Sequence, residues 1–282
     1  MSAELLKGKP IADNIKERLA AELEALKPRI TPKLVALLVG ENPGAVMYAQ
    51  MQAKGCDALG IPYELRELPG DTSQGELAEI IAALNEDASV TGIILQTPVP
   101  QHINQRAMQA AIAPVKDVDG VNPANLGAVV HGDRRLAPCT AQSVFELVEA
   151  SGREIKGAEV VVVGHSEIVG KPVALLLLDK FATITVCHIE TKDTASHTRG
   201  ADILISATGA PGLIKPDWVK PGALVIDVGA PNPDCAEGVA EVAGMITPVP
   251  GGVGPLTVTM LLKNTIESAK MQLPGCGCGC CG

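Results

Sequence analysis

Apolar residues in the first half of the chain alternate between two spacings. Within 11–27 they lie three or four positions apart, which predicts an amphipathic helix. The next apolar stretch, Leu34-Val-Ala-Leu-Leu-Val39, is continuous, as expected for a strand that is buried on both faces. The alternation continues with a predicted helix, strand, helix and strand at 45–59, 63–68, 77–84 and 90–95. This order predicts a mostly parallel sheet covered by helices.

The alternation starts again after Thr140. Glu159-Val-Val-Val-Val-Gly164 is a run of β-branched residues, which is typical of a central strand in a parallel sheet. Around it we predict helices at 141–150, 169–178 and 256–271 and strands at 183–187, 202–206 and 223–227. The fold class is therefore α/β, with two α/β domains and a cleft between them. We expect the domains at 1–140 and 141–255, the second with a Rossmann-like parallel sheet, and the last helix packed back on the first.

Composition and charge narrow the classes of function. The chain has 282 residues, of which 46% are hydrophobic and 2% aromatic, so its cores must be built from Val, Leu, Ile and Ala. A net charge of −9 argues against a nucleic-acid partner, since such proteins usually carry a basic face. No apolar run reaches the roughly 18 residues that a membrane span needs, and the first residues lack the pattern of a signal peptide. We expect a cytoplasmic protein with no membrane partner.

The eight cysteines fall into two groups. Cys56, Cys139, Cys187 and Cys235 are scattered, and we expect them to be free thiols in a reducing compartment. The other four lie between Cys276 and Cys281, in a Gly-rich tail at 272–282 that we expect to be disordered. Thiols can hold a soft metal such as zinc. Their spacing here matches no structural zinc pattern, so we predict no metal site.

Two loops have the composition of a nucleotide site. Residues 247–257 hold three prolines and three glycines before the last predicted helix, so backbone N–H groups can approach a ligand there. The segment from Gly164 to Pro172 joins a buried strand to a helix, where dinucleotide-binding domains place their phosphate loop. The strict Gly-x-Gly-x-x-Gly pattern is absent, because Ser166 replaces the middle glycine and Gly170 comes one residue late. Ordinary strand-to-helix turns are the alternative for both loops.

Five segments then occur in a fixed order: Gln96-Thr-Pro98-Val-Pro100, Lys116-Asp-Val-Asp119-Gly120, Pro138-Cys-Thr140, Val163-Gly-His-Ser166 with Ile168-Val-Gly-Lys-Pro172, and Pro248-Val-Pro-Gly-Gly-Val-Gly-Pro255. From Leu5 to Lys270 the chain closely resembles the methylenetetrahydrofolate dehydrogenase/methenyltetrahydrofolate cyclohydrolase family. The resemblance implies oxidation of 5,10-methylenetetrahydrofolate to the methenyl cation with NAD or NADP, then hydrolysis to 10-formyltetrahydrofolate. It also implies a folate-binding first domain, an NAD(P)-binding second domain, and a homodimer that usually forms through the nucleotide domains.

The resemblance implies roles for individual residues. Tyr48 would line the folate pocket, Gln96 would act in catalysis, and Asp119 would hold the pterin ring. From the residues alone, Tyr48 could equally pack a core, and Asp117 and Asp119 would be solvated loop charges. Further folate contacts would come from Pro98, Pro250, Gly251, Gly252, Pro255 and Thr257. Cofactor contacts would come from Gly164, His165, Ser166, Val169, Gly170, Pro172, Ile189, Glu190, Thr208, Gly209 and Ala230.

One departure from the family pattern concerns the hydrolytic step. The family has a lysine four residues after the active-site tyrosine, on the same helical face, and here that catalytic position is Gln52. Lys54 lies two residues further on, about 200° around the helix. A lysine of lowered pKa can carry a proton, whereas glutamine cannot titrate. We therefore expect dehydrogenase activity with weak or absent cyclohydrolase activity.

Other departures concern the cofactor. His165 and Ile189 stand where the family usually has arginine and serine, positions that face the 2′-phosphate in members that use NADP. Glu190 lies where an acidic residue commonly holds the ribose hydroxyls of NAD, although it could also be a solvated charge. These residues slightly favour NAD over the family's usual NADP. The segment 231–245 is short and lacks the family's usual Gly-Asp-Val.

Two other hypotheses stay open. The enzyme could be fully bifunctional, with Lys54 or a water in place of the missing lysine. In a different class, the chain could be a non-catalytic folate- or nucleotide-binding partner, held in a one-carbon enzyme complex by its cysteine tail. The complete cofactor loop argues against this second hypothesis.

Overall fold

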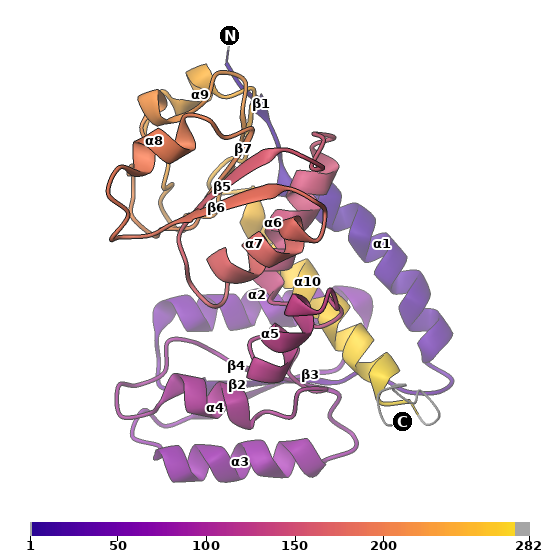
Figure 1. Cartoon of the computed structure of the whole chain (residues 1–282). Coiled ribbons are helices and arrows are strands. Elements are labelled where there is room, and N and C mark those ends of the chain that lie inside the picture. Colours follow the sequence, from indigo (N-terminus) through magenta and orange to yellow (C-terminus); the bar gives the residue numbers. More distant parts are fainter. Residues whose placement is uncertain (1, 274–282) are drawn as a thin grey trace. The chain divides into compact units, whose positions relative to one another are not determined.

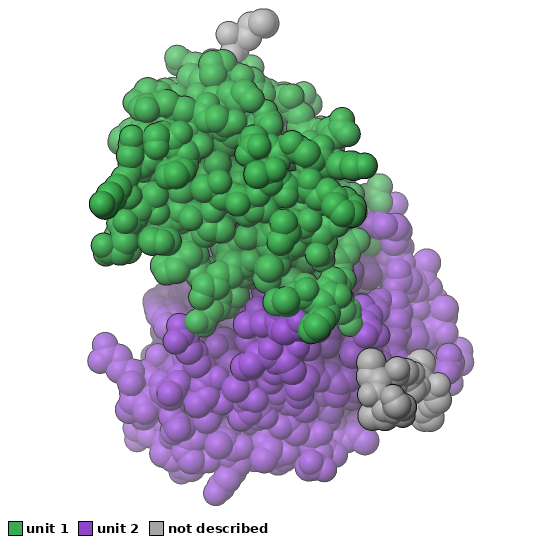
Figure 2. Space-filling view, viewed as in Figure 1, with its two compact units in different colours: residues 1–15, 129–134, 140–260 green, residues 16–128, 135–139, 261–282 purple. Residues whose placement is uncertain are grey.

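The structure is a computed structural model that describes residues 2–273. It divides into two compact units, coloured separately in Figure 2. Unit 1 comprises 1–15, 129–134 and 140–260, and unit 2 comprises 16–128, 135–139 and 261–282. Helices α1 (Gly8–Leu26) and α10 (Val253–Met271) contribute residues to both units. The cysteine tail lies outside the described residues.

Unit 1 is built on a six-stranded parallel sheet. In spatial order its strands are β1 (Glu4–Leu5), β9 (Met245–Ile246), β8 (Leu224–Asp227), β7 (Ile203–Ser206), β5 (Glu159–Val163) and β6 (Thr183–Cys187). Its connecting helices are α6 (Cys139–Ala150), α7 (Gly170–Leu178), α8 (Thr194–Thr198), the 3₁₀ turn η1 (Pro216–Trp218) and α9 (Val239–Val242). The central strands β5, β7 and β8 are buried along almost their whole length, which explains their runs of Val, Ile and Leu.

Unit 2 is built on a three-stranded parallel sheet in the order β3 (Tyr63–Leu68), β2 (Leu34–Val39), β4 (Gly92–Leu95). Its helices are α2 (Pro43–Leu59), α3 (Gln74–Glu86), α4 (Gln105–Ala111) and α5 (Pro123–Val130). Alternate residues of β2 and β4 pack with α3 and α4 in one apolar cluster, and Figure 1 shows α2 on the opposite face of the sheet. Both faces of β2 are therefore buried, as its continuous apolar sequence predicts.

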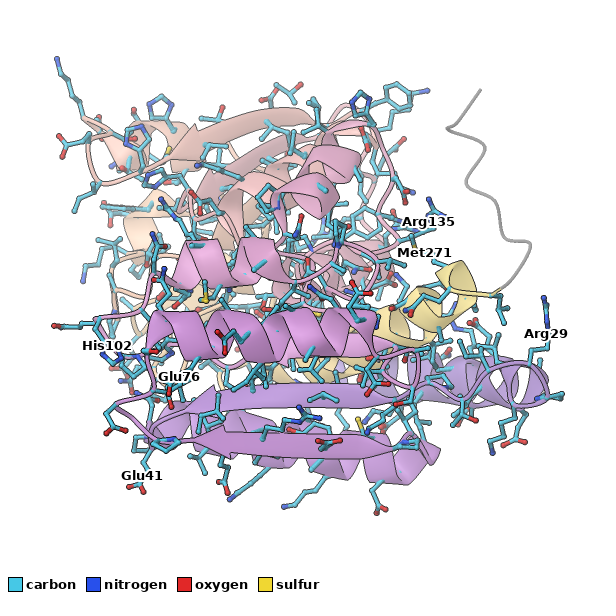
Figure 3. All side chains as sticks on the ribbon, turned by 90° about the horizontal axis from the view of Figure 1, so that it is seen from below. Arg29, Glu41, Glu76, His102, Arg135 and Met271 are labelled. Atoms are coloured by element: carbon cyan, nitrogen blue, oxygen red, sulfur yellow. The ribbon has the colours of Figure 1, made fainter. Side chains whose placement is uncertain are left out.

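Local signals fix the ends of several of these elements. Helix α3 begins with a capping box, in which the Ser73 side chain accepts from the Glu76 N–H at 3.2 Å and Glu76 accepts from the Ser73 N–H at 2.8 Å. His102 contacts the carbonyl of Thr72 at 2.9 Å, and Figure 3 shows Glu76 and His102 at the same end of this helix. The turn before α3 is thus held by Glu76, through Ser73, and by His102, through Thr72.

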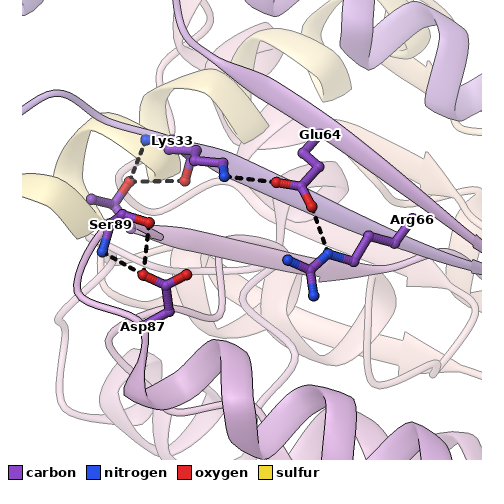
Figure 4. Close-up of polar contacts among 6 residues, drawn as sticks. Lys33, Glu64, Arg66, Asp87 and Ser89 are labelled. Atoms are coloured by element: carbon purple, nitrogen blue, oxygen red, sulfur yellow. Dashed lines mark hydrogen bonds and ion pairs between the residues drawn. The ribbon is translucent and has the colours of Figure 1, made fainter.

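The edge strand β3 carries charge where it meets solvent. Glu64 pairs with Lys33 and with Arg66, each at 2.6 Å (Figure 4). Hydrogen bonds from Lys33 and Arg66 lower the pKa of Glu64 below its usual range. Charged residues on an edge strand oppose pairing with a foreign strand. Figure 4 also shows Asp87, the residue directly after α3, accepting from the N–H and the hydroxyl of Ser89.

The predicted fold class is confirmed, and the predicted strands match the observed ones to within two residues. The short elements β1, β9, α4, α5, α8, α9 and η1 were not predicted, because a run of two to eight residues carries too little periodicity. Helix α10 begins at Val253 instead of Leu256. Gly254 and Pro255 therefore belong to its first turn, where a proline loses no intrahelical hydrogen bond.

The second half of α10 is tied to unit 2 by polar side chains. Asn264 Nδ2 donates to the carbonyls of Val118 at 2.9 Å and Ala137 at 3.0 Å. Ser268 Oγ donates to the carbonyl of Thr91, and Gln272 Nε2 donates to the same carbonyl at 2.9 Å. These bonds place residues 264–272 in unit 2, which also holds Tyr48, Gln52, Gln96 and Asp119.

Residues 2–273 lack the features of a membrane-spanning helix and of a metal cluster. No helix in this range is both long and apolar enough to cross a membrane. The same range contains no group of three or more His, Cys, Asp or Glu side chains that could hold a metal ion.

Candidate active site

Helix α2 presents Tyr48 and Gln52 on one face. Its start is fixed by Asn42, whose side chain accepts from the Ala45 N–H at 3.1 Å, and by Pro43 in the first turn. Residues four apart on a helix are neighbours on its surface. Tyr48 is half-buried and Gln52 is fully buried. The helix thus directs an aromatic hydroxyl and a primary amide to the same place.

Gln52 and Gln96 form a reciprocal amide pair across unit 2. Gln96 follows β4 directly and is buried. Its Nε2 donates to Gln52 Oε1 at 2.8 Å, and Gln52 Nε2 donates to Gln96 Oε1 at 3.3 Å. The Tyr63 hydroxyl lies 3.3 Å from Gln52 Oε1 and 3.2 Å from the Ala49 carbonyl, and can donate to either. Each amide therefore satisfies the other without a charge.

Lys54 does not join this pair. It is exposed on α2, whereas Gln52 is fully buried. The two residues are separated by about 200° around the helix, since each residue turns the chain by about 100°. The position four residues after Tyr48 thus carries a buried group that cannot gain or lose a proton near neutral pH.

Asp117 and Asp119 are not solvated loop charges, contrary to what the residues alone suggest. Asp117 is fully buried and accepts from the backbone N–H groups of Gly120 at 3.1 Å and Asn122 at 2.7 Å, and from Asn125 Nδ2 at 2.9 Å. Burial raises its pKa, which these hydrogen bonds oppose. Asp117 therefore organises the loop in which Asp119 is placed.

Asp119 is half-buried and has a different electrostatic setting. Burial, followed by the negative charge of Asp117, raises the pKa of Asp119 to about 7, while a hydrogen bond with Cys139 opposes the rise. Burial also raises the pKa of Tyr48 well above its usual range, and Cys139 and Asp119 add to that rise. Tyr48, Gln52, Gln96, Asp119 and Cys139 thus form one cluster in unit 2.

Three members of the surroundings were missed from the sequence. Cys139 is buried, with its Sγ 3.3 Å from the Val118 carbonyl and 3.6 Å from Asn264 Nδ2. Burial raises the pKa of Cys139 well above its usual range, and the positive charge of Lys263 opposes this rise. Asn264 and Lys263 lie on α10, far along the chain from Asp119. No local pattern could have placed them here, because the contact depends on how α10 packs.

In unit 1 the predicted cofactor residues gather at the carboxyl ends of neighbouring strands. Gly164 follows β5, Glu190 lies three residues after β6, Thr208 two after β7 and Ala230 three after β8. These strands are parallel, so their carboxyl ends share one edge of the sheet. Dinucleotides bind at this edge in doubly wound sheets.

The turn from β5 into α7, the expected phosphate loop, closes tightly through two glycines. Gly164 has φ +124°, and a Cβ there would lie 2.2 Å from the Ala207 carbonyl oxygen. A Cβ on Gly170 would lie 2.0 Å from the Gly164 carbonyl oxygen, so the turn closes only with glycine at both positions. Ser166 Oγ accepts from the Val169 N–H at 3.2 Å. The first turn of the nine-residue helix α7 follows, where N–H groups favour an anion.

The residues that the sequence analysis linked to cofactor choice are exposed. His165 and Glu190 are exposed, and 92% of Ile189 is accessible. The Glu190 N–H donates to His188 Nδ1 at 3.2 Å. This part of the edge offers no arginine or lysine at either position that the family uses for a 2′-phosphate.

The shortened segment after β8 contains a buried aspartate that the sequence analysis missed. Asp234 is fully buried, and its Oδ2 accepts from Ser206 Oγ at 2.9 Å and from the Thr208 N–H at 2.7 Å. Its Oδ1 has no hydrogen-bond partner among the described residues. Asp227, at the end of β8, accepts from the N–H groups of Gly229 at 2.8 Å and Asp234 at 3.1 Å. Asp234 thus fixes the Ala207–Gly209 turn despite the missing Gly-Asp-Val.

The Gly/Pro loop 247–252 is anchored at both ends. Thr247 Oγ1 accepts from the Asp227 N–H at 2.8 Å, and the Gly252 N–H donates to the Pro248 carbonyl at 2.7 Å. Gly251 has φ +109°, a conformation that favours glycine. Pro255 and Thr257 lie in the first turns of α10, and Thr257 Oγ1 bonds the Val253 carbonyl at 3.4 Å. Pro98, in unit 2, is exposed after Gln96.

Comparisons with known proteins match nearly the whole chain to one family. The catalytic domain of tetrahydrofolate dehydrogenase/cyclohydrolase matches residues 6–119, and its NAD(P)-binding domain matches residues 138–273. The bifunctional protein FolD of Moorella thermoacetica is 46% identical over 279 residues, covering 96% of this chain and 100% of its own.

Two solved structures are similar to this chain along nearly its whole length. The bifunctional FolD dehydrogenase/cyclohydrolase from Campylobacter jejuni has a TM-score of 0.92 and 41% identity, covering 96% of this chain and 100% of its own. The Trypanosoma brucei FolD, solved with NADP and an inhibitor, has a TM-score of 0.90 and 38% identity, covering 96% and 98%.

Proposed function

We propose, from the premise that this chain belongs to the tetrahydrofolate dehydrogenase/cyclohydrolase family, a division between its two activities. The chain is a methylenetetrahydrofolate dehydrogenase with an NAD(P)-binding domain. The proposal is that hydride transfer is efficient and that hydrolysis of the methenyl product is weak or absent. The observation that carries it is the uncharged Gln52–Gln96 pair.

For hydride transfer, these residues need only bind and orient the folate. In our proposal the Asp119 carboxylate accepts hydrogen bonds from N–H groups of the pterin ring, and Tyr48 packs beside it. Gln96 offers its amide to the same ligand from the end of β4. The cation that forms is stabilised by its own two nitrogens, so no side chain has to carry a proton at the reacting carbon. The loss of a titrating group at Gln52 therefore leaves this step intact.

Hydrolysis makes a different demand. A water that attacks the cation must lose a proton, and general acid–base catalysis of such a step typically contributes about 10²–10⁴-fold. Gln52 cannot take that proton, and its Oε1 already accepts from Gln96. Each primary amide in the pair can orient a water but cannot deprotonate it.

The test compares two lysine substitutions on α2. Gln52→Lys restores a titrating group beside Gln96 and should raise methenyl hydrolysis by about 10²–10⁴-fold. Gln50→Lys adds the same charge at an exposed position of the same helix and should leave hydrolysis unchanged. Both rates are followed by methenyl absorbance, with dehydrogenase activity as the check that Gln52→Lys still folds. A folded Gln52→Lys enzyme that hydrolyses no faster than Gln50→Lys would contradict the proposal.

A fully bifunctional enzyme is the alternative, favoured by the curated relatives that are named bifunctional. It requires a substitute for the missing lysine. Lys54 is exposed on α2, whereas Lys263 lies near enough to Cys139 to lower its pKa. If the wild type hydrolyses the methenyl cation rapidly, Lys54→Met and Lys263→Met identify which of the two takes part.

For the cofactor, we propose a preference for NAD at and above neutral pH. The support is the neutral Ile189 and the nearby Glu190 carboxylate, which disfavours a 2′-phosphate. The ratio of kcat/KM for NAD and NADP, measured at about pH 8 and matched ionic strength, tests this. An advantage of about tenfold for NADP, worth about 1.4 kcal/mol, would contradict it.

We also propose that the chain forms a homodimer through the open edge of β6. Among the described strands β6 pairs only with β5, so its other edge is open. Leu178, Phe181 and Val186 surround it with exposed fractions of 53%, 74% and 38%. An open edge flanked by apolar side chains suits a second copy of the chain. Phe181→Glu should shift sedimentation toward the monomer, whereas Leu5→Glu, at the opposite sheet edge, should not. A monomeric wild type would refute the interface.

A further inference from the structure

Two histidines lie side by side at the carboxyl edge of the unit 1 sheet. His165 comes after β5 and His188 comes after β6, and these strands pair with Val163 opposite Cys187. The ring centroids are 5.3 Å apart, with 51° between the ring planes. Both side chains are exposed. Sheet pairing brings them together, so the sequence did not show that His188 belongs beside His165.

The backbone holds His188 in a defined turn. Its N–H donates to Thr191 Oγ1 at 2.9 Å, and its carbonyl accepts from the Thr191 N–H at 2.8 Å. Its Nδ1 accepts from the Glu190 N–H at 3.2 Å. This bond requires an unprotonated Nδ1, so the neutral ring carries its proton on Nε2. Protonation converts both ring nitrogens into donors and releases the Glu190 N–H.

The pair also has a defined place in the nucleotide site. His165 directly follows Gly164, whose missing Cβ lets the phosphate turn close against Ala207. His188 lies two residues before Glu190, the residue expected at the ribose hydroxyls. An adenosine ribose between the phosphate turn and Glu190 would therefore meet both rings near its 2′ position.

Fixed charges around the two rings nearly cancel. The segments that carry the pair also hold three carboxylates and two ammonium groups: Glu167, Lys171, Glu190, Lys192 and Asp193. The neighbouring turn after β7, residues 207–213, contains no charged residue. The net charge of these segments is thus slightly negative, and protonation of the rings makes the place more favourable for a phosphate dianion.

We propose that His165 and His188 together form the contact for the 2′ position of the adenosine ribose and make cofactor choice depend on pH. The protonated pair binds the 2′-phosphate of NADP, and the neutral pair leaves the enzyme selective for NAD. Histidine is the side chain that ordinarily changes charge between pH 5 and 8. NADP use therefore rises relative to NAD as pH falls. This inference rests on the proposed binding of a nicotinamide dinucleotide at this edge.

Fragment binding tests it without turnover. The Kd values of 2′,5′-ADP and 5′-AMP are measured by calorimetry with the full chain at about pH 6 and about pH 8.5. The 2′,5′-ADP should bind at least about tenfold tighter at the lower pH, because imidazolium meets a phosphate there. The 5′-AMP lacks the 2′-phosphate and should change by less than about twofold. Equal pH responses of the two fragments would overturn the inference.

Substitutions separate the pair from other sources of pH dependence. The double variant with His165→Asn and His188→Asn should lose the pH response of 2′,5′-ADP, whereas His197→Asn, on the neighbouring helix α8, should keep it. His165→Arg should bind 2′,5′-ADP tightly at both pH values. A pH response that survives in the double variant would overturn the inference while leaving the nucleotide site standing. Failure of both fragments to bind the wild type would refute the nucleotide site, and this inference with it.

Discussion

At the scale of single residues, burial decides between roles that the sequence leaves open. Asp117 and Asp119 stand two positions apart in one loop, yet Asp117 is fully buried among N–H donors and Asp119 is half-buried beside Cys139. A pattern of alternating aspartates cannot show this, because their partners Asn125 and Cys139 come from other segments. The role of Asp234 could not be predicted for the same reason. Its hydrogen-bond donors, Ser206 and Thr208, lie at the end of a different strand.

The raised pKa of Asp119 predicts a pH dependence for folate binding. With a pKa of about 7, Asp119 becomes a carboxylate as pH rises through 7, and in the proposed function only the carboxylate accepts hydrogen bonds from the pterin N–H groups. The kcat/KM for methylenetetrahydrofolate should therefore rise between about pH 6 and pH 8, since kcat/KM reports the free enzyme's groups. The same raised pKa means that folding stability falls as pH rises from about 4 to about 7, where the unfolded chain releases this proton and the folded chain holds it, and that the cost stays constant above pH 7. Asp119→Asn should remove this pH dependence.

The check is a pair of pH profiles. The wild type should show the rise in kcat/KM, and Asp119→Asn should show a lower, flat profile with the methenyl product still formed slowly. An unchanged profile in Asp119→Asn would assign the pH dependence to another group.

At the scale of elements, continuous apolar runs predicted the buried strands well, because a strand in a parallel sheet must be apolar on both faces. Strand β2 and strand β5 were placed to within one residue. The first residues of helices were predicted less accurately than the bounds of these strands. Helix α10 begins three residues before the predicted Leu256, because a proline and a glycine in a first turn look like a loop in sequence.

The second prediction concerns the glycine turn that leads into α7. Gly170→Ala should greatly weaken dinucleotide binding, because the added Cβ would lie 2.0 Å from the backbone oxygen of Gly164 and 3.0 Å from the His165 nitrogen. Gly127→Ala is the matched control, since a Cβ there meets no atom within 4 Å. NADH fluorescence titration measures both. Equal affinity of the two variants would show that the turn does not hold the cofactor.

At the scale of the whole molecule, each unit has its own parallel sheet, and α1 and α10 contribute to both. The sequence predicted two α/β domains because the strand–helix alternation restarts after Thr140. It could not show that α10 brings Asn264 against Cys139, the residue that bonds Asp119. That arrangement depends on Asn264 and Ser268 on α10 and on Gln272 directly after it, whose side chains bond backbone carbonyls of unit 2.

Truncation after Leu273 provides the third prediction. The polar contacts of α10 with unit 2 end at Gln272, and Leu273 is itself buried. A chain that stops at Leu273 keeps all of these contacts, so its dehydrogenase activity should stay within about twofold of the full chain, a change below about 0.5 kcal/mol. Truncation before Asn264, which removes the contacts, is the matched comparison. A large loss on removing only the tail would show that its thiols take part.

The division between the two activities is tested most directly by the fate of the methenyl cation made by the wild-type enzyme. Methylenetetrahydrofolate and NAD are supplied, and methenyl absorbance is followed together with NADH during and after a limited turnover. The Gln52–Gln96 pair predicts that methenyl appears in step with NADH and then decays at its uncatalysed rate, whatever the enzyme concentration. Methenyl that fails to accumulate, or a decay that accelerates in proportion to enzyme, would contradict the account.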